Sequence, residues 1–190
     1  MEHQPTIETE RLLLRPFSIS DADVVMALAG TKQVYATTLN VPYPYEPGMA
    51  EKWISTHASQ FYNGTGLTLA ITLKRTGEIV GTIGIGITKQ HFRAELGYWI
   101  GHEYWGNGYC TEAAKAIIEY AFNVVKLHKI TSRFMEVNPA SGRVMEKAGM
   151  TREGKLIDEV TKDNVYHSLI VYGKINGEQP HAADAEERRR

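Results

Sequence analysis

Hydrophobic residues change their spacing along the chain, and each change predicts a different element of secondary structure. Over residues 47–62, apolar and aromatic residues recur every three or four positions, which is typical of an amphipathic helix. Over residues 67–73 they recur at every second position, which indicates a half-buried strand. A polar turn at 74–77 follows, so we expect a returning strand over 79–88 that completes a hairpin.

The N-terminal part of the chain is less regular. A strand is expected over 10–17, where a proline stops it. Ser20 then has the position of a helix N-cap, with Asp23 three residues later, and Gly30 supplies a C-terminal stop. Three prolines between residues 38 and 47 predict a loop rather than a regular element.

After residue 90 the pattern predicts six more elements, in the order strand, helix, strand, helix, strand, strand. Their expected bounds are 92–101, 111–125, 129–137, 140–148, 150–160 and 165–172. The complete prediction is one mixed α+β domain over residues 6–175, with about seven strands and about four helices. The segment 176–190 is polar and ends in EERRR, and we expect it to be disordered.

Composition narrows the class of protein. The 190 residues are 43% hydrophobic and 23% charged, as in ordinary soluble domains. A formal net charge of -1 argues against nucleic-acid partners and anionic membranes. The single cysteine excludes an internal disulfide, and no apolar run has the length of a signal peptide core or a membrane span. We therefore expect a cytoplasmic protein, and a homodimer is left open.

The sharpest chemical signal is a glycine-bearing loop between an apolar strand and a helix, in the segment YWIGHEYWGNGYCTEA (98–113). Gly106 and Gly108 allow a tight turn that exposes backbone N–H groups without an intervening Cβ. The start of a helix adds unpaired N–H groups and about half a positive charge. Together these features predict a site for a phosphate-bearing ligand.

Two well-known phosphate-binding motifs do not fit this loop. It lacks the Gly-Lys-Ser/Thr of a P-loop, and Thr111 occupies the third glycine position of a dinucleotide fingerprint. On spacing alone, a plain strand-to-helix turn explains the two glycines equally well.

Three segments together resemble the GNAT superfamily of N-acetyltransferases, in particular its RimJ/RimL-like branch of ribosomal-protein N-acetyltransferases. ELGYWI (95–100) followed by WGNGYCTEA (105–113) is similar to the family's acetyl-CoA signature, Gln/Arg-x-x-Gly-x-Gly/Ala, with Glu103 in the place of Gln/Arg. NPASGRVMEKAGM (138–150) resembles the next motif, and ETERLLLR (8–15) resembles the opening strand of the branch. The likeness covers roughly residues 6–175, in the right order.

The resemblance implies a fold, a cosubstrate and a set of residues that bind it. The fold is a central, mostly antiparallel twisted sheet with one parallel, splayed pair of strands. The cosubstrate is acetyl-CoA, with its pantetheine between the splayed strands, its pyrophosphate on the glycine loop, and the side-chain amide of Asn138 on its arm. The residues implied to bind it are Trp99, Ile100, Gly101, Trp105, Gly106, Asn107, Gly108, Tyr109, Cys110 and Asn138.

The resemblance also suggests catalytic residues. Glu95 is the candidate general base or water-organising group, with a pKa that burial would raise, although a structural role in the sheet explains it equally well. Ser141 could hydrogen-bond the leaving sulfur, or could be a helix N-terminal hydroxyl without a catalytic part. Many family members carry a tyrosine acid where this chain has Met145. Glu136 and His91 are weaker candidates for the base.

Covalent and metal-dependent chemistry receive little support. Cys110 invites an acyl-enzyme interpretation because a helix start lowers the pKa of a thiol. The implied geometry, however, sets it beside the pyrophosphate, where a buried small residue is the simpler interpretation. The seven histidines lack metal-ligand spacing, so no metal is expected.

The implied reaction is direct transfer of an acetyl group from acetyl-CoA to a primary amine in a ternary complex. A protein N-terminal α-amine is the first choice of acceptor, and a polyamine, amino acid or antibiotic amine stays open. A noncatalytic acyl-CoA-binding module is the alternative from another class, and Met145 is the residue in its favour. Four aromatic residues are candidates for the acceptor groove, although loop or core packing explains them as well: Tyr43, Tyr45, Trp53 and Tyr166.

Overall fold

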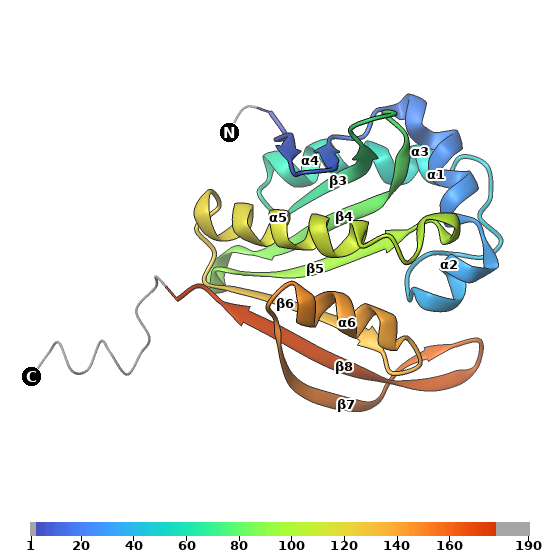
Figure 1. The fold of residues 1–190 in the computed structure, drawn as a ribbon. Coiled ribbons are helices and arrows are strands. Elements are labelled where there is room, and N and C mark those ends of the chain that lie inside the picture. The colour runs from blue at the N-terminus through green and yellow to red at the C-terminus, as the bar shows by residue number, and fades with distance from the viewer. Residues whose placement is uncertain (1–2, 178–190) are drawn as a thin grey trace, which may run out of the picture.

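A computed structural model of the chain describes residues 3–177 as one sheet with helices on both faces (Figure 1). The strands are β1 (Ile7–Glu8), β2 (Leu12–Arg15), β3 (Gly66–Leu73), β4 (Ile79–Thr88), β5 (Arg93–Ile100), β6 (Lys129–Met135), β7 (Thr151–Lys162) and β8 (Val165–Ile175). The α-helices are α1 (Ala22–Ala29), α2 (Lys32–Thr37), α3 (Met49–Ser55), α4 (His57–Tyr62), α5 (Tyr109–Asn123) and α6 (Pro139–Lys147). Short 3-10 turns are η1 (Ile19–Asp21), η2 (Lys89–His91) and η3 (His102–Tyr104).

The sheet has the strand order β1-β2-β3-β4-β5-β6-β8-β7. Neighbouring strands are antiparallel except β5 and β6, which are parallel and pair only from Arg93–Lys129 to Glu95–Thr131. Beyond Glu95 the two strands separate, although each keeps its other neighbour along its length. The predicted mixed α+β class, with a mostly antiparallel sheet and one splayed parallel pair, is therefore confirmed.

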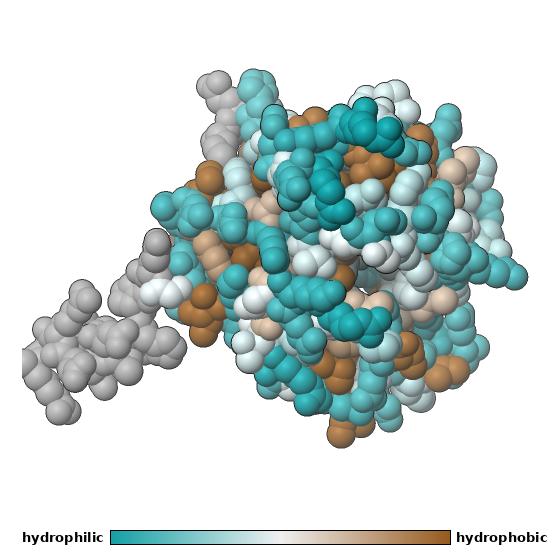
Figure 2. Space-filling view, in the orientation of Figure 1, coloured by the Kyte–Doolittle hydropathy of each residue, from teal (hydrophilic) through white to brown (hydrophobic). Residues whose placement is uncertain are grey.

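Side-chain alternation along the strands divides the helices between the two faces. On β3, Leu69 and Ile71 join the main core with α5 and α6, whereas Ala70 packs with Leu28 of α1. On β5, Ile100 belongs to the main core and Trp99 packs against the α1 and α3 cluster. The exterior face in Figure 2 is mostly hydrophilic, with hydrophobic residues in small separated patches. The two faces of β5 thus look toward different helices.

Several predicted elements need correction. The helix expected over 47–62 is two helices, because the Thr56 hydroxyl bonds back to the Trp53 carbonyl at 2.7 Å where α3 ends. Ser20 is not an N-cap. Ser18 caps η1, where its hydroxyl and the Asp21 carboxylate form a capping box, and Asp21 is the N-cap residue of α1. Helix α2 and strand β1 were not predicted, because α2 buries only Val34 and β1 has two residues.

The C-terminal boundary also differs in detail from the expectation. Asn176 was predicted to open a disordered tail, but it is buried and its backbone N–H donates to the His128 carbonyl at 2.8 Å. The rest of that predicted tail, apart from Gly177, lies outside the described residues. None of the helices described across residues 3–177 has the length and apolar character that a bilayer span requires.

Candidate active site

The separation of β5 from β6 exposes backbone groups in the middle of the sheet. Gly101 N–H donates to the Val80 carbonyl of β4 at 2.9 Å, so by alternation the N–H groups of Ile100 and Tyr98 face away from β4. The Ile100 carbonyl on that side accepts a hydrogen bond from the Trp105 indole at 2.7 Å. The gap between the splayed strands is therefore edged by main-chain donors of Tyr98 and Ile100.

The start of α5 is built to receive an anion. Gly106 and Gly108 have φ of 81° and 78°, in the left-handed region that favours glycine. The first backbone N–H of α5 to bond back is that of Glu112, which donates to the Gly108 carbonyl at 3.1 Å. The N–H groups of Tyr109, Cys110 and Thr111 precede that bond and lie at the positive end of the helix dipole.

A cleft of about 330 Å³ leads along this helix start toward the gap, between α5 and α6. Arg143 and Lys147 line its α6 side at i and i+4 spacing. No carboxylate belongs to its lining within the described part of the chain. Neither Arg143 nor Lys147 was predicted to line the site. Their i, i+4 spacing, which places them on one face of the predicted helix, was the signal in the sequence. The cleft therefore favours a ligand with several negative charges.

Eight of the ten residues implied to bind the cosubstrate line the α5–α6 cleft, and Gly101 and Asn107 do not. The Asn107 side-chain amide instead donates to the carbonyls of Tyr104 and Trp105, at 3.0 and 3.3 Å, which folds the loop on itself. The Asn138 side-chain amide, expected on the cosubstrate arm, donates to the Thr37 carbonyl at 3.0 Å. Asn138 thus ties the end of α2 to the start of α6.

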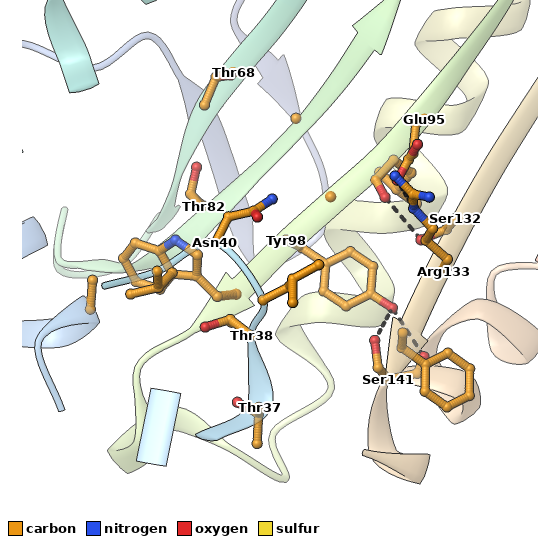
Figure 3. A pocket seen from close by; sticks show the side chains of 18 of the residues that line it. Thr37, Thr38, Asn40, Thr68, Thr82, Glu95, Tyr98, Ser132, Arg133 and Ser141 are labelled. Carbon is orange, nitrogen blue, oxygen red and sulfur yellow. Dashed lines mark hydrogen bonds and ion pairs between the residues drawn. The ribbon is translucent and has the colours of Figure 1, made fainter. Parts of the chain in front are cut away.

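A larger groove of about 690 Å³ approaches the same gap from the side of α1 and α3 (Figure 3). It runs under the loop that carries Asn40 and reaches Glu95 and Arg133 on the splayed strands. The groove and the α5–α6 cleft share five lining residues, Thr37, Thr38, Tyr98, Trp99 and Ser141. The two recesses therefore meet between β5, α2 and α6.

Glu95 is not buried, contrary to the expectation for a base with a raised pKa. Its side chain is 47% exposed and its Oε1 lies 2.8 Å from Arg133 Nε. The pairing of β5 with β6 ends at Glu95, so its carboxylate faces the widening groove instead of the interior. Its charge is balanced by Arg133 from the neighbouring strand.

Ser141 meets a hydroxyl that sequence reasoning did not single out. Its Oγ lies 2.9 Å from the Tyr98 hydroxyl, which also donates to the Ser141 carbonyl at 3.0 Å (Figure 3). Burial strongly raises the pKa of the Tyr98 phenol, so the phenol keeps its proton at neutral pH. Met145, fully buried, lines the groove beside this pair.

The weaker candidates for catalytic residues either lie outside the two recesses or have an unreactive side chain. Burial raises the pKa of the Cys110 thiol, which keeps it protonated and a poor nucleophile. Glu136 is paired with Lys155 at 2.7 Å, and His91 is exposed on η2. Neither Glu136 nor His91 belongs to the lining of the groove or of the cleft.

The structure divides the four aromatic residues expected at the acceptor groove. Tyr45 and Trp53 line the large groove. Tyr43 does not line it and packs against the Tyr35 ring, with centroids 5.5 Å apart. Tyr166 is 69% exposed near the tip of the β7–β8 hairpin and does not line it either. Small polar side chains that were not predicted contribute more of the lining, among them Thr37, Thr38, Asn40, Thr68 and Thr82.

Comparison with known proteins identifies the family. The family model described as "Acetyltransferase (GNAT) domain" matches residues 11–151, most of the chain. The chain belongs to the GNAT acetyltransferase family. It is therefore an N-acetyltransferase of a family that uses acetyl-CoA, and the resemblance noted in the sequence is confirmed.

Relatives of this acetyltransferase differ in the acceptor that their names state. It is 30% identical to "Uncharacterized N-acetyltransferase YoaA" of Bacillus subtilis (strain 168) over 88% of this chain and 95% of that protein. It is 31% identical to "Putative ribosomal N-acetyltransferase YdaF" of the same organism, over 54% and 56% of the two chains. It is 33% identical to the spermidine N(1)-acetyltransferase of Escherichia coli (strain K12), over 50% and 51%.

Among solved structures, Mycobacterium smegmatis RimJ in complex with CoA-disulfide has the same fold. The TM-score is 0.81, with 22% sequence identity over 97% of this chain and 94% of that chain. At that identity the likeness supports the fold of this acetyltransferase and leaves its acceptor unassigned.

Proposed function

We propose that this acetyltransferase holds acetyl-CoA in the α5–α6 cleft and acetylates the α-amine of a protein N-terminus that enters through the large groove. The observation that carries the proposal is the meeting of the two recesses at Tyr98, Trp99 and Ser141, where the sheet is open. Two reactants that enter from opposite sides can touch there and react directly, without an acyl-enzyme.

The α5–α6 cleft fits the cosubstrate by charge and by backbone geometry. The N–H groups of residues 106–111 would hold the pyrophosphate at the positive end of the α5 dipole. Arg143 and Lys147 would balance the remaining phosphate charge from the opposite wall. The bound cosubstrate supplies an activated thioester, and the chain supplies position and hydrogen bonds.

Backbone donors at the gap would assist attack by the amine. The N–H of Ile100 or Tyr98 can donate to the acetyl oxygen as negative charge develops on it, and one such donor is commonly worth about 2.7–4 kcal/mol. An α-amine with a pKa near 8 is about one-tenth neutral at pH 7, so only a weak base is needed. Glu95, paired with Arg133 and open to the groove, would take up the amine proton through water.

The hydroxyl pair would face the leaving sulfur. Tyr98, kept protonated by burial, contacts both the carbonyl and the Oγ of Ser141, and this contact would hold the serine hydroxyl beside the cleft, where it can donate to the leaving sulfur. A hydroxyl donor at this position stabilises a developing thiolate, which Met145 is unable to do. The hydroxyl pair can do the work of the tyrosine acid that many family members carry at the position of Met145. It therefore favours a catalytic function over a noncatalytic acyl-CoA-binding module.

The charges of the large groove favour a singly charged acceptor over a polyamine. Glu95 is its one carboxylate among the described residues, and Arg133 already balances it. Lys52 adds a positive charge on the α3 side. A polyamine carries several positive charges and would be repelled there, whereas a peptide with one α-amine would not. Neutral threonine and asparagine side chains in the lining suit a peptide backbone.

A thiol-release assay with a panel of acceptors tests this function. We expect release of free CoA from acetyl-CoA with short peptides bearing a free N-terminus, and at least about tenfold lower kcat/KM with spermidine. The control peptides carry the same sequence with an acetylated N-terminus and an internal lysine. Faster turnover of spermidine than of every peptide would overturn the peptide proposal, and tight CoA binding without turnover on any acceptor would favour the noncatalytic module.

A further inference from the structure

The opening segment of the chain makes contacts that the proposed reaction has not used. Thr9 and Arg11, before β2, reach Glu112 in the first turn of α5, about one hundred residues later. The Thr9 hydroxyl donates to Glu112 Oε1 at 2.6 Å, and the Arg11 backbone N–H donates to the same oxygen at 2.8 Å. The Arg11 Nε donates to Glu112 Oε2 at 2.7 Å. Three hydrogen bonds therefore converge on one carboxylate.

The same guanidinium also holds the glycine loop. Arg11 Nη1 donates to the Asn107 carbonyl at 3.0 Å, and the Arg11 guanidinium lies 4.9 Å from the centre of the Tyr109 ring. A Cβ placed on Gly108 would lie 3.5 Å from Arg11 Nη2, so the guanidinium packs against that glycine. Arg11 thus touches three consecutive residues of the loop and the helix turn that follows them.

The electrostatics of the helix start require a partner for Glu112. A carboxylate one turn into α5 would repel a phosphate at the same N-terminus unless its charge is balanced nearby. Arg11 provides that balance. Burial alone would raise the pKa of Glu112. Hydrogen bonds from Thr9 and Arg11 outweigh burial and hold this pKa below its ordinary value. Glu112 therefore stays ionised and bound to Arg11.

We propose that Thr9, Arg11 and Glu112 form a clamp that sets residues 106–109 in the conformation that receives the pyrophosphate of acetyl-CoA. The inference rests on the proposed function of this loop. Arg11 and Glu112 are positioning residues here, because Arg11 Nε and Nη1 are used by Glu112 and Asn107. A loop ordered before binding spares the ligand the conformational entropy of ordering it, which appears as affinity.

Comparing acetyl-CoA with S-acetylpantetheine isolates this effect. S-acetylpantetheine carries the same thioester without the pyrophosphate, so it cannot report on the loop's hold on phosphate. For Arg11→Gln and for Glu112→Gln we expect the ratio of kcat/KM for acetyl-CoA to that for S-acetylpantetheine to fall at least about fivefold. The fall should come through KM for acetyl-CoA, with kcat little changed. Calorimetry with CoA should report the same loss of affinity.

A matched control and the thermal midpoint separate the clamp from a general loss of structure. Lys74→Gln breaks another ion pair beside the same strand, that of Lys74 with Glu8 at 3.1 Å, and should leave the ratio unchanged. A variant that melts well above the assay temperature and keeps the wild-type ratio would overturn the clamp.

Two further outcomes are distinguishable. If Arg11→Gln lowers the ratio and Glu112→Gln does not, Arg11 acts as a direct phosphate ligand and the clamp is wrong. If the unmodified protein turns over neither thioester and binds no CoA, the proposed function itself has failed.

Discussion

At the scale of single residues, the meeting of two hydroxyls from different elements carries most of the proposed chemistry. Tyr98 comes from β5 and Ser141 from α6, and their oxygens are 2.9 Å apart where the cleft and the groove join. The Tyr98 phenol keeps its proton and contacts both the carbonyl and the Oγ of Ser141, so it holds the serine side chain in place. The orientation of Ser141 therefore depends on a residue more than forty positions earlier in the chain.

Tyr98→Phe removes that donor while keeping the ring. We expect kcat to fall about tenfold, the order of one lost hydrogen bond at a developing charge, with KM for acetyl-CoA within about twofold of its original value. Ser141→Ala should cause a similar fall. The double variant should be hardly worse than either single variant, because the two residues act as a unit. Steady-state thiol release measures all three.

Tyr172→Phe is the matched control. Its hydroxyl donates to Glu146 at 2.7 Å, also on α6 but outside both recesses, so that change should leave kcat unaltered. A Tyr98→Phe protein with undiminished kcat would remove the phenol from the mechanism and leave it a structural contact of α6.

The residue scale also marks where sequence reasoning stopped. Ser141 and Glu95 both line the large groove, so the chain order of motifs was enough to bring them to one region. Their partners were not predictable, because Arg133 and Tyr98 reach them across the β5–β6 gap. Sequence spacing within a strand does not determine the register between strands that are parallel and splayed. The exposure of Glu95 follows from that register, and so does its pairing with Arg133.

At the scale of elements, the start of α5 combines a helix dipole with a loop that only glycine accommodates well. Gly106 and Gly108 are both left-handed, and a β-branched residue is strongly disfavoured in that region. A side chain at Gly108 would meet Arg11 only at an ordinary contact distance, so strain rather than collision is the obstacle. The loop must change conformation to accept another residue.

Gly108→Val should therefore weaken CoA binding at least about tenfold, as the loop shifts its N–H groups away from the phosphates. Isothermal titration calorimetry gives the measurement. Gly48→Val is the control. Gly48 also has a left-handed φ, of 86°, and a Cβ added there would meet no other atom. It precedes α3 and does not line the α5–α6 cleft. That control should lose stability and keep its affinity for CoA. Equal affinity losses in the two variants would count against the phosphate site.

Elements with a clear hydrophobic period were the predictable ones. The existence and order of β3, β4 and α5 followed from the pattern. Helix α5 buries one regular face, whereas β3, expected to be half-buried, is buried on both faces because helices cover both sides of the sheet. Helix α2 buries only Val34, so it has no stripe to detect, and its N-cap Thr31 gave the one local signal. This undetected helix supplies Thr37, which lines both recesses. The part of the site that α2 contributes was therefore the hardest to predict from the sequence.

At the scale of the whole molecule, one buried histidine sets a limit on stability at low pH. His57 is 3% exposed and packs between Trp53 and Phe17, with no hydrogen-bond partner for either ring nitrogen among the described residues. Burial lowers its pKa from 6.5 to about 4, because a charged imidazolium would be poorly solvated there. Between these two pKa values the unfolded chain binds a proton that the folded chain does not.

Stability should therefore fall as the pH falls from about 6.5 toward 4. From pH 7.5 to pH 5.0 the loss assigned to His57 is about 2 kcal/mol. His57→Leu should remove this part of the pH dependence, and it should cost little at pH 7.5 because no hydrogen bond is lost. Urea unfolding of both proteins at the two pH values measures the difference. An identical pH dependence in the two proteins would contradict it.

The convergence of two recesses on one opening in the sheet has a kinetic consequence. In a single dead-end pocket, the reactant bound deeper must arrive first and its product must depart last. In the proposed arrangement each reactant enters through its own recess, and five residues line both recesses. The acetylated product can diffuse away while spent CoA stays seated, or the reverse, so the sequence of arrivals and departures is left to the concentrations around the enzyme.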